Sequence, residues 1–248
     1  MFSSKKSTNI MEIYWVILII VVASLVKGIT GFGFALVSLP PLMIWYSPKE
    51  LIPVLILCNL FISTVIVLQK KEKKLVSRQF RTFIIFGGIF TILGVVTLKN
   101  ISEDLLIKTL SVFLILLSLL SLLGIKYSVK LTNTSYKVAG AFLGFLTGST
   151  SISGPPMALF LHSANVDNKQ FREIFAWFSI VTTIIALTGY AMFGLLTKNT
   201  FQMAGMFLPI LYLGTYFGKR INHLIPIPVF KTSILIITLF ASIMLLLK

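Results

Sequence analysis

Two stretches decide the fold, KGITGFGFALVSLPP at residues 27–41 and GFLTGSTSISGPP at residues 144–156. Each lies in an apolar part of the chain, combines glycines with hydroxyl residues, and ends in a Pro-Pro pair that a new apolar run follows. Glycine frees the backbone, whereas proline removes an N–H donor and ends helices. An unbroken membrane helix needs neither, so we expect two broken or re-entrant membrane segments, one in each half of the chain.

The composition of the whole chain is that of an integral membrane protein. Of the 248 residues, 56% are hydrophobic and 12% are charged, and the mean hydropathy is +0.97. A soluble domain has about 25% charged residues. Eight or nine apolar helices of about 20 residues would use nearly the whole chain. We therefore predict an all-α membrane protein with about eight transmembrane helices and no soluble catalytic domain.

Two apolar stretches, residues 13–46 and 138–164, are too long for one membrane helix. The first would be about 50 Å long as a straight helix, whereas the hydrocarbon core is about 30 Å thick. We place the breaks at residues 27–33 and 147–156. Three ordinary spans follow each break, at residues 51–69, 83–98 and 105–123 in the first half and 171–196, 201–217 and 229–247 in the second.

The matching order of segments indicates an internal duplication. The two Pro-Pro pairs start 115 residues apart, which is close to half the chain. We assign residues 1–125 to the first transmembrane repeat, 126–137 to a cytoplasmic linker, and 138–248 to the second repeat.

The formal net charge of +15 comes mainly from basic residues in short loops. Six of them lie between residues 70 and 81. The positive-inside rule therefore places this loop in the cytoplasm, and no nucleic acid is needed to explain the charge. The polar N-terminus leads into the first membrane segment rather than a cleaved signal peptide. We expect a multi-pass protein of the cytoplasmic membrane.

The sequence allows two topologies for the second half of the chain. If residues 138–164 cross the membrane once, Lys219, Arg220 and His223 lie outside, against the positive-inside rule. If the segment enters and leaves on one side, these residues lie inside. The rule favours a re-entrant segment, whereas eight true crossings is the simpler count.

The broken segments are the predicted substrate site. A break within the membrane exposes N–H groups at the start of the next half-helix, where the helix dipole favours an anion. Small residues also let membrane helices pack closely, and this alternative explains Gly87, Gly88, Gly140 and Gly144. The candidate binding residues in the two stretches are Gly28, Thr30, Gly31, Gly33, Ser38, Pro40, Thr147, Gly148, Ser149, Ser151, Ser153, Gly154 and Pro155.

Four further polar residues are candidates, each with a simpler alternative. Lys27 next to the first break would attract an anion, or its side chain would extend to the membrane interface. The guanidinium of Arg172 suits a sulfonate, sulfite or carboxylate, or it is an interfacial charge. Asn59 would bind substrate or a neighbouring helix, and His162 would titrate near neutral pH or lie at the interface.

The sequence lacks the residues that several other functions require. Cys58 is the single cysteine, so disulfides and cysteine-based metal sites are excluded. No Asp or Glu lies deep in a predicted span, which argues against a cation channel. No nucleotide-binding loop, metal-binding cluster or catalytic triad is evident. We expect no enzyme activity and no cofactor or metal; the expected partners are a small anion and membrane lipids, and homo-oligomer formation is left open.

The two quoted stretches, together with Phe171-Arg172, resemble the sulfite exporter TauE/SafE membrane family. The resemblance implies about eight spans in two related halves. It also implies movement of sulfur oxyanions, organosulfur compounds or small organic anions across the cytoplasmic membrane, usually outward.

The sequence departs from the family pattern at Ser149-Thr150-Ser151, where many members have more glycines, and this difference bears on the choice of anion.

The leading hypothesis is a secondary transporter that exports a small sulfur-containing anion, such as sulfite or an organosulfonate. One alternative is an importer or channel for another small organic or inorganic anion. Another is a membrane scaffold without transport activity.

Overall fold

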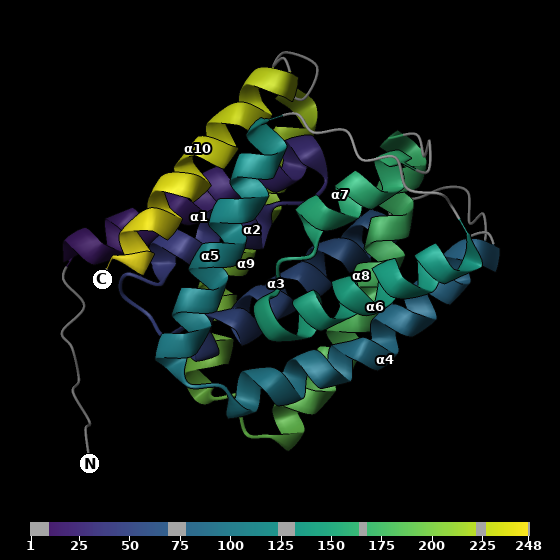
Figure 1. Ribbon diagram of the computed structural model, residues 1–248. Helices are drawn as coiled ribbons and strands as arrows, with labels where there is room; N and C mark the ends of the chain where they lie inside the picture. The colour runs from purple at the N-terminus through teal and green to yellow at the C-terminus, as the bar shows by residue number, and fades with distance from the viewer. Residues whose placement is uncertain (1–9, 69–77, 124–131, 164–167, 222–226, 248) are drawn as a thin grey trace.

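The computed structural model describes residues 10–68, 78–123, 132–163, 168–221 and 227–247. These residues form helices and short turns, with no β-strand in the ranges described, which confirms the all-α prediction (Figure 1). The helices of the first half are α1 (Ile10–Thr30), α2 (Phe34–Leu42), α3 (Pro48–Leu68), α4 (Arg78–Asn100) and α5 (Glu103–Leu122). Those of the second half are α6 (Asn133–Thr150), α7 (Gly154–Ser163), α8 (Asn168–Met192), α9 (Lys198–Ile221) and α10 (Ile227–Leu246).

Several helices have the length and composition of membrane spans. Five segments within α1, α3, α4, α5 and α8 are long and apolar enough to cross a bilayer, and α10 contributes a shorter apolar segment. Large apolar side chains such as Trp15, Leu116 and Phe240 are exposed on α1, α5 and α10. Exposed apolar surface of this kind suits contact with lipid. The described helices support a membrane protein, but fewer of them qualify as spans than the eight predicted.

Both over-long apolar stretches are broken, as predicted. Helix α1 ends at Thr30 and α2 begins at Phe34, and the three residues between them are not helical. Gly31 and Gly33 have φ values of 87° and 91°. These values lie in the left-handed region that side chains with a Cβ avoid, so the first break requires its glycines.

The second break has the same length and spacing. Helix α6 ends at Thr150 and α7 begins at Gly154. A threonine ends the first helix of each pair and accepts a hydrogen bond from the backbone N–H two residues later. Phe32 N donates to Thr30 Oγ1 (3.2 Å), and Ile152 N donates to Thr150 Oγ1 (3.1 Å). The two breaks are therefore equivalent at a separation of 120 residues, from Gly31 to Ser151.

The two Pro-Pro pairs are not equivalent, so the predicted separation of 115 residues aligns the wrong positions. Pro40 and Pro41 lie inside α2, near its C-terminal end. Pro155 and Pro156 are instead the second and third residues of α7. Proline fits the first turn of a helix because N–H groups there have no intrahelical acceptor.

One end of the bundle, here called the turn end, gathers the turns between α2 and α3, α4 and α5, and α8 and α9. Ser47 Oγ donates to Glu103 Oε1 (2.6 Å), which joins the first two turns. Lys99 Nζ donates to the Phe193 carbonyl (3.1 Å), which joins the second and third. The opposite end is called the linker end, because α5 ends there and α6 begins there.

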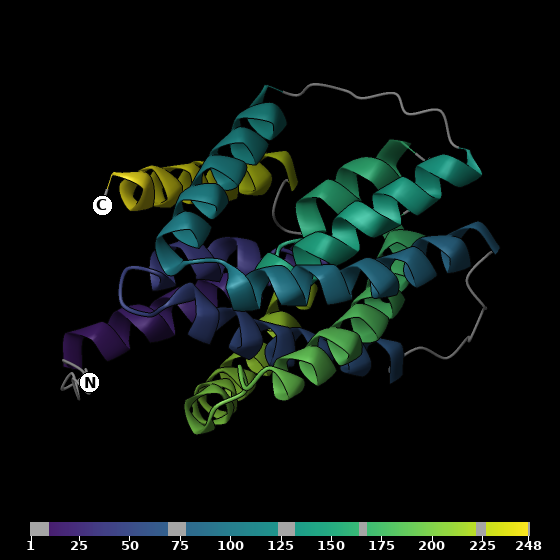
Figure 2. The same cartoon turned by 60° about the horizontal axis from the view of Figure 1, so that its bottom comes forward.

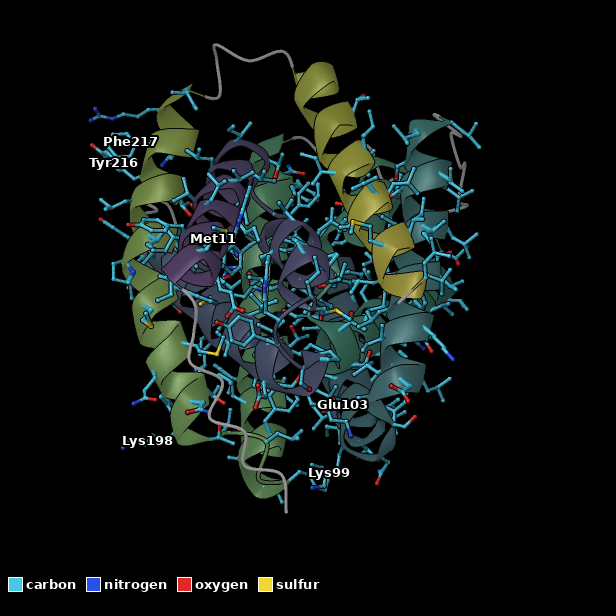
Figure 3. The ribbon with its side chains drawn as sticks, turned by 90° about the vertical axis from the view of Figure 1, so that its left-hand side faces the viewer. Met11, Lys99, Glu103, Lys198, Tyr216 and Phe217 are labelled. Carbon is cyan, nitrogen blue, oxygen red and sulfur yellow. The ribbon has the colours of Figure 1, made fainter. Side chains whose placement is uncertain are left out.

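Figure 3 shows the two ends of the bundle from the side. Lys99, Glu103 and Lys198 all lie at the turn end, and Tyr216 and Phe217 lie at the linker end of α9. Helix α9 therefore runs from the turn end to the linker end.

The second broken segment is a hairpin that starts and finishes at the linker end. Helix α6 runs beside α4 in the same direction, because Tyr136 contacts Phe80 and Gly148 faces Thr91. Phe160 of α7 makes an edge contact with Tyr136 at the start of α6, with ring centroids 5.4 Å apart. The chain thus returns to where α6 began, which is the re-entrant alternative.

The first broken segment is a hairpin of the opposite orientation. Helix α1 runs beside α9 in the same direction, because Ser24 faces Gly214 and Gly28 faces Gly218. It therefore starts at the turn end, and α2 leads back to that end.

In Figure 2, α5 and α10 lie together on one side, apart from α4, α6 and α7.

Small residues bring α4 and α6 into backbone contact. Gly140, Gly144 and Gly148 follow one another at every fourth position of α6 and face the backbone of α4. Thr91 Oγ1 donates across the interface to the Gly144 carbonyl (3.1 Å). A Cβ at Gly144 would overlap the carbonyl oxygen of Gly87. The close-packing alternative is thus confirmed for these glycines, as it is for Gly88 against α8.

We predict that Gly144→Ala lowers the thermal stability of the purified protein. The added methyl group would push α6 from α4, and such overpacking costs about 1–3 kcal/mol. Gly205→Ala is the matched control, because no atom lies within 4 Å of the added Cβ and alanine favours a helix. Unchanged melting of Gly144→Ala would contradict the packing of α4 on α6.

We also predict that Asn133 and Lys219 lie on the same side of the membrane and Lys99 on the other. Single cysteines at these exposed positions, with Cys58 replaced by alanine, would be labelled in intact cells with an impermeant maleimide. Lys99→Cys should react, whereas Asn133→Cys and Lys219→Cys should react only after permeabilisation. Opposite accessibility of Asn133→Cys and Lys219→Cys would show that residues 138–164 cross the membrane.

Candidate functional site

The two breaks meet at a small cavity inside the bundle. Its empty volume is about 370 Å³, a figure that includes space open to the outside. The first break and the start of α2, α3, the second break and the start of α7, and one face of α8 all contribute to its lining. The lining residues are Gly33, Phe34, Ala35, Leu36, Asn59, Thr147, Ser151, Ile152, Ser153, Gly154, Pro155, Phe175, Ser179 and Thr183.

Helix α2 presents backbone donors to this cavity. Its N-cap is Gly33, which makes no side-chain capping hydrogen bond, and its first intrahelical bond runs from Val37 N to Gly33 O (3.1 Å). The N–H groups of Phe34, Ala35 and Leu36 precede that bond and have no intrahelical acceptor. All three residues are buried and line the cavity. The positive end of the helix dipole therefore faces the cavity.

Helix α7 contributes fewer donors than the sequence predicted. Pro155 and Pro156 have no N–H group, and Met157 N donates to the Ser153 carbonyl (3.0 Å). The expectation that each half-helix supplies a set of free amides therefore holds for α2 alone.

Hydroxyl groups take the place of amides on the α7 side. In the part of the chain that the structure describes, the O–H groups of Ser151, Ser153 and Ser179 have no acceptor. Thr147 and Thr183 differ, because their O–H groups donate to the carbonyls of Leu143 and Ser179. The three serines are therefore the side-chain donors that remain available to a ligand.

A buried lysine is linked to the cavity through an asparagine. Lys27 is 2% exposed, and its Nζ donates to Asn59 Oδ1 (2.5 Å). Asn59 Nδ2 in turn donates to Ser151 Oγ (3.2 Å). Lys27 does not line the cavity itself, so its charge acts on the cavity from behind Asn59. The alternative in which Lys27 reaches the membrane interface is wrong, because its side chain ends at Asn59 inside the bundle.

One face of α8 was missed by the sequence analysis. Phe175, Ser179 and Thr183 are four residues apart, so they share one side of the helix. This period of four was visible in the sequence. However, α8 has no break, and a spacing of four alone does not mark polar residues in an unbroken helix as part of a site.

The structure brings seven predicted site residues to the cavity: Gly33, Asn59, Thr147, Ser151, Ser153, Gly154 and Pro155. Gly31 and Thr30 instead shape the first break. Gly28 packs on α9 and Gly148 on α4, where an added Cβ would meet neighbouring backbone. Ser38 and Ser149 donate to carbonyls one turn earlier in their helices, and Pro40 lies inside α2. The side chains of Arg172 and His162 lie outside the described residues.

The cavity is electrostatically suited to a hydrogen-bond acceptor. Among the described residues that line it, none is acidic or basic. Backbone N–H groups, serine hydroxyls and the charge of Lys27 behind Asn59 all favour negative charge on a bound group. The aromatic ring of Phe175 and the side chain of Ile152 supply its apolar surface.

The sequence was also compared with known proteins. The family described as Sulfite exporter TauE/SafE matches residues 16–245 of the 248. No curated protein and no solved structure matches the chain. The family match includes both broken segments and every residue of the cavity. The chain therefore belongs to the sulfite exporter TauE/SafE family of membrane transporters.

Proposed function

We propose that this protein is a secondary transporter that exports a small sulfur-containing anion, such as sulfite or an organosulfonate, across the cytoplasmic membrane. The observation that carries the proposal is the cavity between the two breaks. It combines the uncapped start of α2 with three free serine hydroxyls, and no acidic side chain is among its described lining residues.

An oxyanion suits this cavity for a physical reason. Sulfite and sulfonates present several oxygen acceptors on one compact group, which matches donors that converge from different directions. Phe34 and Ala35 contribute backbone donors, and Ser151 and Ser179 contribute hydroxyl donors. A cation would meet the positive end of the α2 dipole and no carboxylate, so its desolvation would not be compensated. Membership of the family supports the sulfur oxyanion as the substrate class.

The packing of the helices supports two pseudo-repeated halves, residues 1–125 and 138–248 around the linker at 126–137. Helices α1 to α5 and α6 to α10 follow the same order, including the break after the first helix. Helix α1 packs on α9 and α6 on α4, which is the same contact with the halves exchanged. The hairpins also enter from opposite ends. Rocking of one half against the other would open the cavity to each side in turn.

The orientation follows from the basic residues at the linker end. Lys219 and Arg220 end α9 there, and Lys137 lies near the start of α6. The positive-inside rule assigns this end to the cytoplasm. With the interior negative, outward movement of a monovalent anion gains about 2.3 kcal/mol per 100 mV, so export requires no coupling ion.

Transport by purified protein in liposomes would test the proposal. Counterflow of radiolabelled sulfite that saturates with concentration is the expected result, together with thermal stabilisation by sulfite, thiosulfate or sulfoacetate. Taurine, sulfate and lactate complete the ligand panel. Stabilisation by neutral or cationic compounds in preference to sulfite, thiosulfate and sulfoacetate would contradict the proposal. A flux that does not saturate with concentration would indicate a channel.

We predict that Ser179→Ala raises the half-saturating sulfite concentration about tenfold or more, because a hydrogen bond to a charged group is worth about 1.5–3 kcal/mol. Thr183→Val is the matched control one turn away. Its hydroxyl hydrogen is already bonded to the Ser179 carbonyl, so a change below about threefold is expected. Equal effects of the two substitutions in the flux assay would argue against serine donors in the site.

A further inference from the structure

The buried lysine sets the direction of a hydrogen-bond chain that ends in the cavity. An ammonium group has three donors and no acceptor, so only the carbonyl oxygen of Asn59 can face Lys27. The amide of Asn59 then has one orientation, with Nδ2 toward Ser151. In the described part of the chain no carboxylate pairs with Lys27, so Asn59 is the group that relays its charge.

The hydrogen bond from Asn59 also sets the role of Ser151. Its oxygen accepts from Asn59 Nδ2, and a hydroxyl that accepts a hydrogen bond keeps its own hydrogen free to donate. Ser151 lines the cavity, and its O–H has no acceptor among the described residues. The chain of donors therefore runs in one direction, from Lys27 through Asn59 to Ser151 and on to the cavity.

The backbone at Ser151 provides an independent observation. Its φ is 61°, and it is the one non-glycine residue with positive φ among those described. Gly31 occupies the equivalent place in the first break, also with positive φ. Glycine would adopt this conformation without the cost that a Cβ imposes. A serine here accepts that cost and places a hydroxyl between Asn59 and the cavity, which points to a use of the side chain.

We infer that Lys27 and Asn59 are positioning residues that occupy one acceptor site of Ser151 Oγ and leave its O–H group to donate into the cavity, so that the cavity favours ligands that accept hydrogen bonds over isosteric ligands that donate them. The inference rests on the proposed function and deepens it. On this inference the cavity selects its ligand by hydrogen-bond acceptors as well as by the sign of the ligand charge. A sulfonamide, in which an NH2 group replaces the third oxygen, fits the same space but offers fewer acceptors to Ser151 and the other donors of the cavity.

The test compares methanesulfonate with methanesulfonamide, which has a similar shape but is neutral and carries N–H donors. Dissociation constants of both would be measured by calorimetry on the full-length purified protein. The wild type should prefer methanesulfonate. Ser151→Gly should still fold, because a φ of 61° suits glycine, although Asn59 Nδ2 loses its acceptor. The variant should lose at least about tenfold of this preference.

Lys27→Gln tests the direction of the chain. A glutamine amide can donate or accept, so Asn59 is free to turn its carbonyl oxygen toward Ser151. Ser151 would then donate to Asn59 and accept from the ligand. Methanesulfonamide should therefore bind more tightly than to the wild type, which loss of the lysine charge alone would not cause, and the preference for methanesulfonate should fall about tenfold or more. Ser38→Ala is the matched control, because its buried hydroxyl donates within α2 and does not line the cavity; it should keep the wild-type preference.

The outcomes separate this inference from the proposed function. If folded Ser151→Gly keeps the wild-type ratio of the two constants, the inference is overturned while anion transport stands. The same holds if Lys27→Gln keeps that ratio. If Lys27→Gln does not fold, Ser151→Gly decides alone. If the wild type binds neither methanesulfonate nor sulfite, both the proposed function and the inference are overturned.

Discussion

Unpaired backbone groups cannot face lipid, and this constraint organises the protein. Each break places three non-helical residues between its two helices, Gly31–Gly33 in the first and Ser151–Ser153 in the second. Such backbone is stable in a membrane only where protein or a polar cavity surrounds it. Thr30 and Thr150 each satisfy one backbone N–H within their break. Gly33, Ser151, Ile152 and Ser153 of the two breaks line the cavity, so the requirement for enclosure also creates the site.

Enclosure depends on how closely the hairpins approach the long helices. The α6 hairpin packs on α4 through glycines at every fourth position, and the α1 hairpin packs on α9 through Ser24, Gly28, Gly214 and Gly218. Close backbone contact of this kind stabilises helix pairs in lipid, where the hydrophobic effect does not drive association. Residues such as Gly28 and Gly148 thus serve the site indirectly, by holding the breaks in register.

The two breaks have the same length but different chemistry. Two glycines let the first break turn so that α2 directs its amides into the cavity. Prolines at the start of α7 remove amides from the second break, and serines supply hydroxyl donors in their place. The positive charge of Lys27 is kept one residue away, behind Asn59. An anion in the cavity would therefore meet neutral donors and would not contact the ammonium directly.

The sequence by itself determined the class of the protein and the location of the breaks, because hydropathy, glycine and proline act locally on the backbone. It also indicated seven of the residues that line the cavity, six through their position in the broken stretches and Asn59 as a polar residue within an apolar span. Three things depended on the tertiary structure. The α8 face of Phe175, Ser179 and Thr183 reaches the site only through the packing of α8 against α3 and α4. The division of the glycines between packing and site depends on which helix lies opposite each one, as Gly148 and Gly33 illustrate. The return of α7 to the start of α6 depends on contacts between residues that are distant in sequence, such as Phe160 with Phe83, which local patterns do not encode.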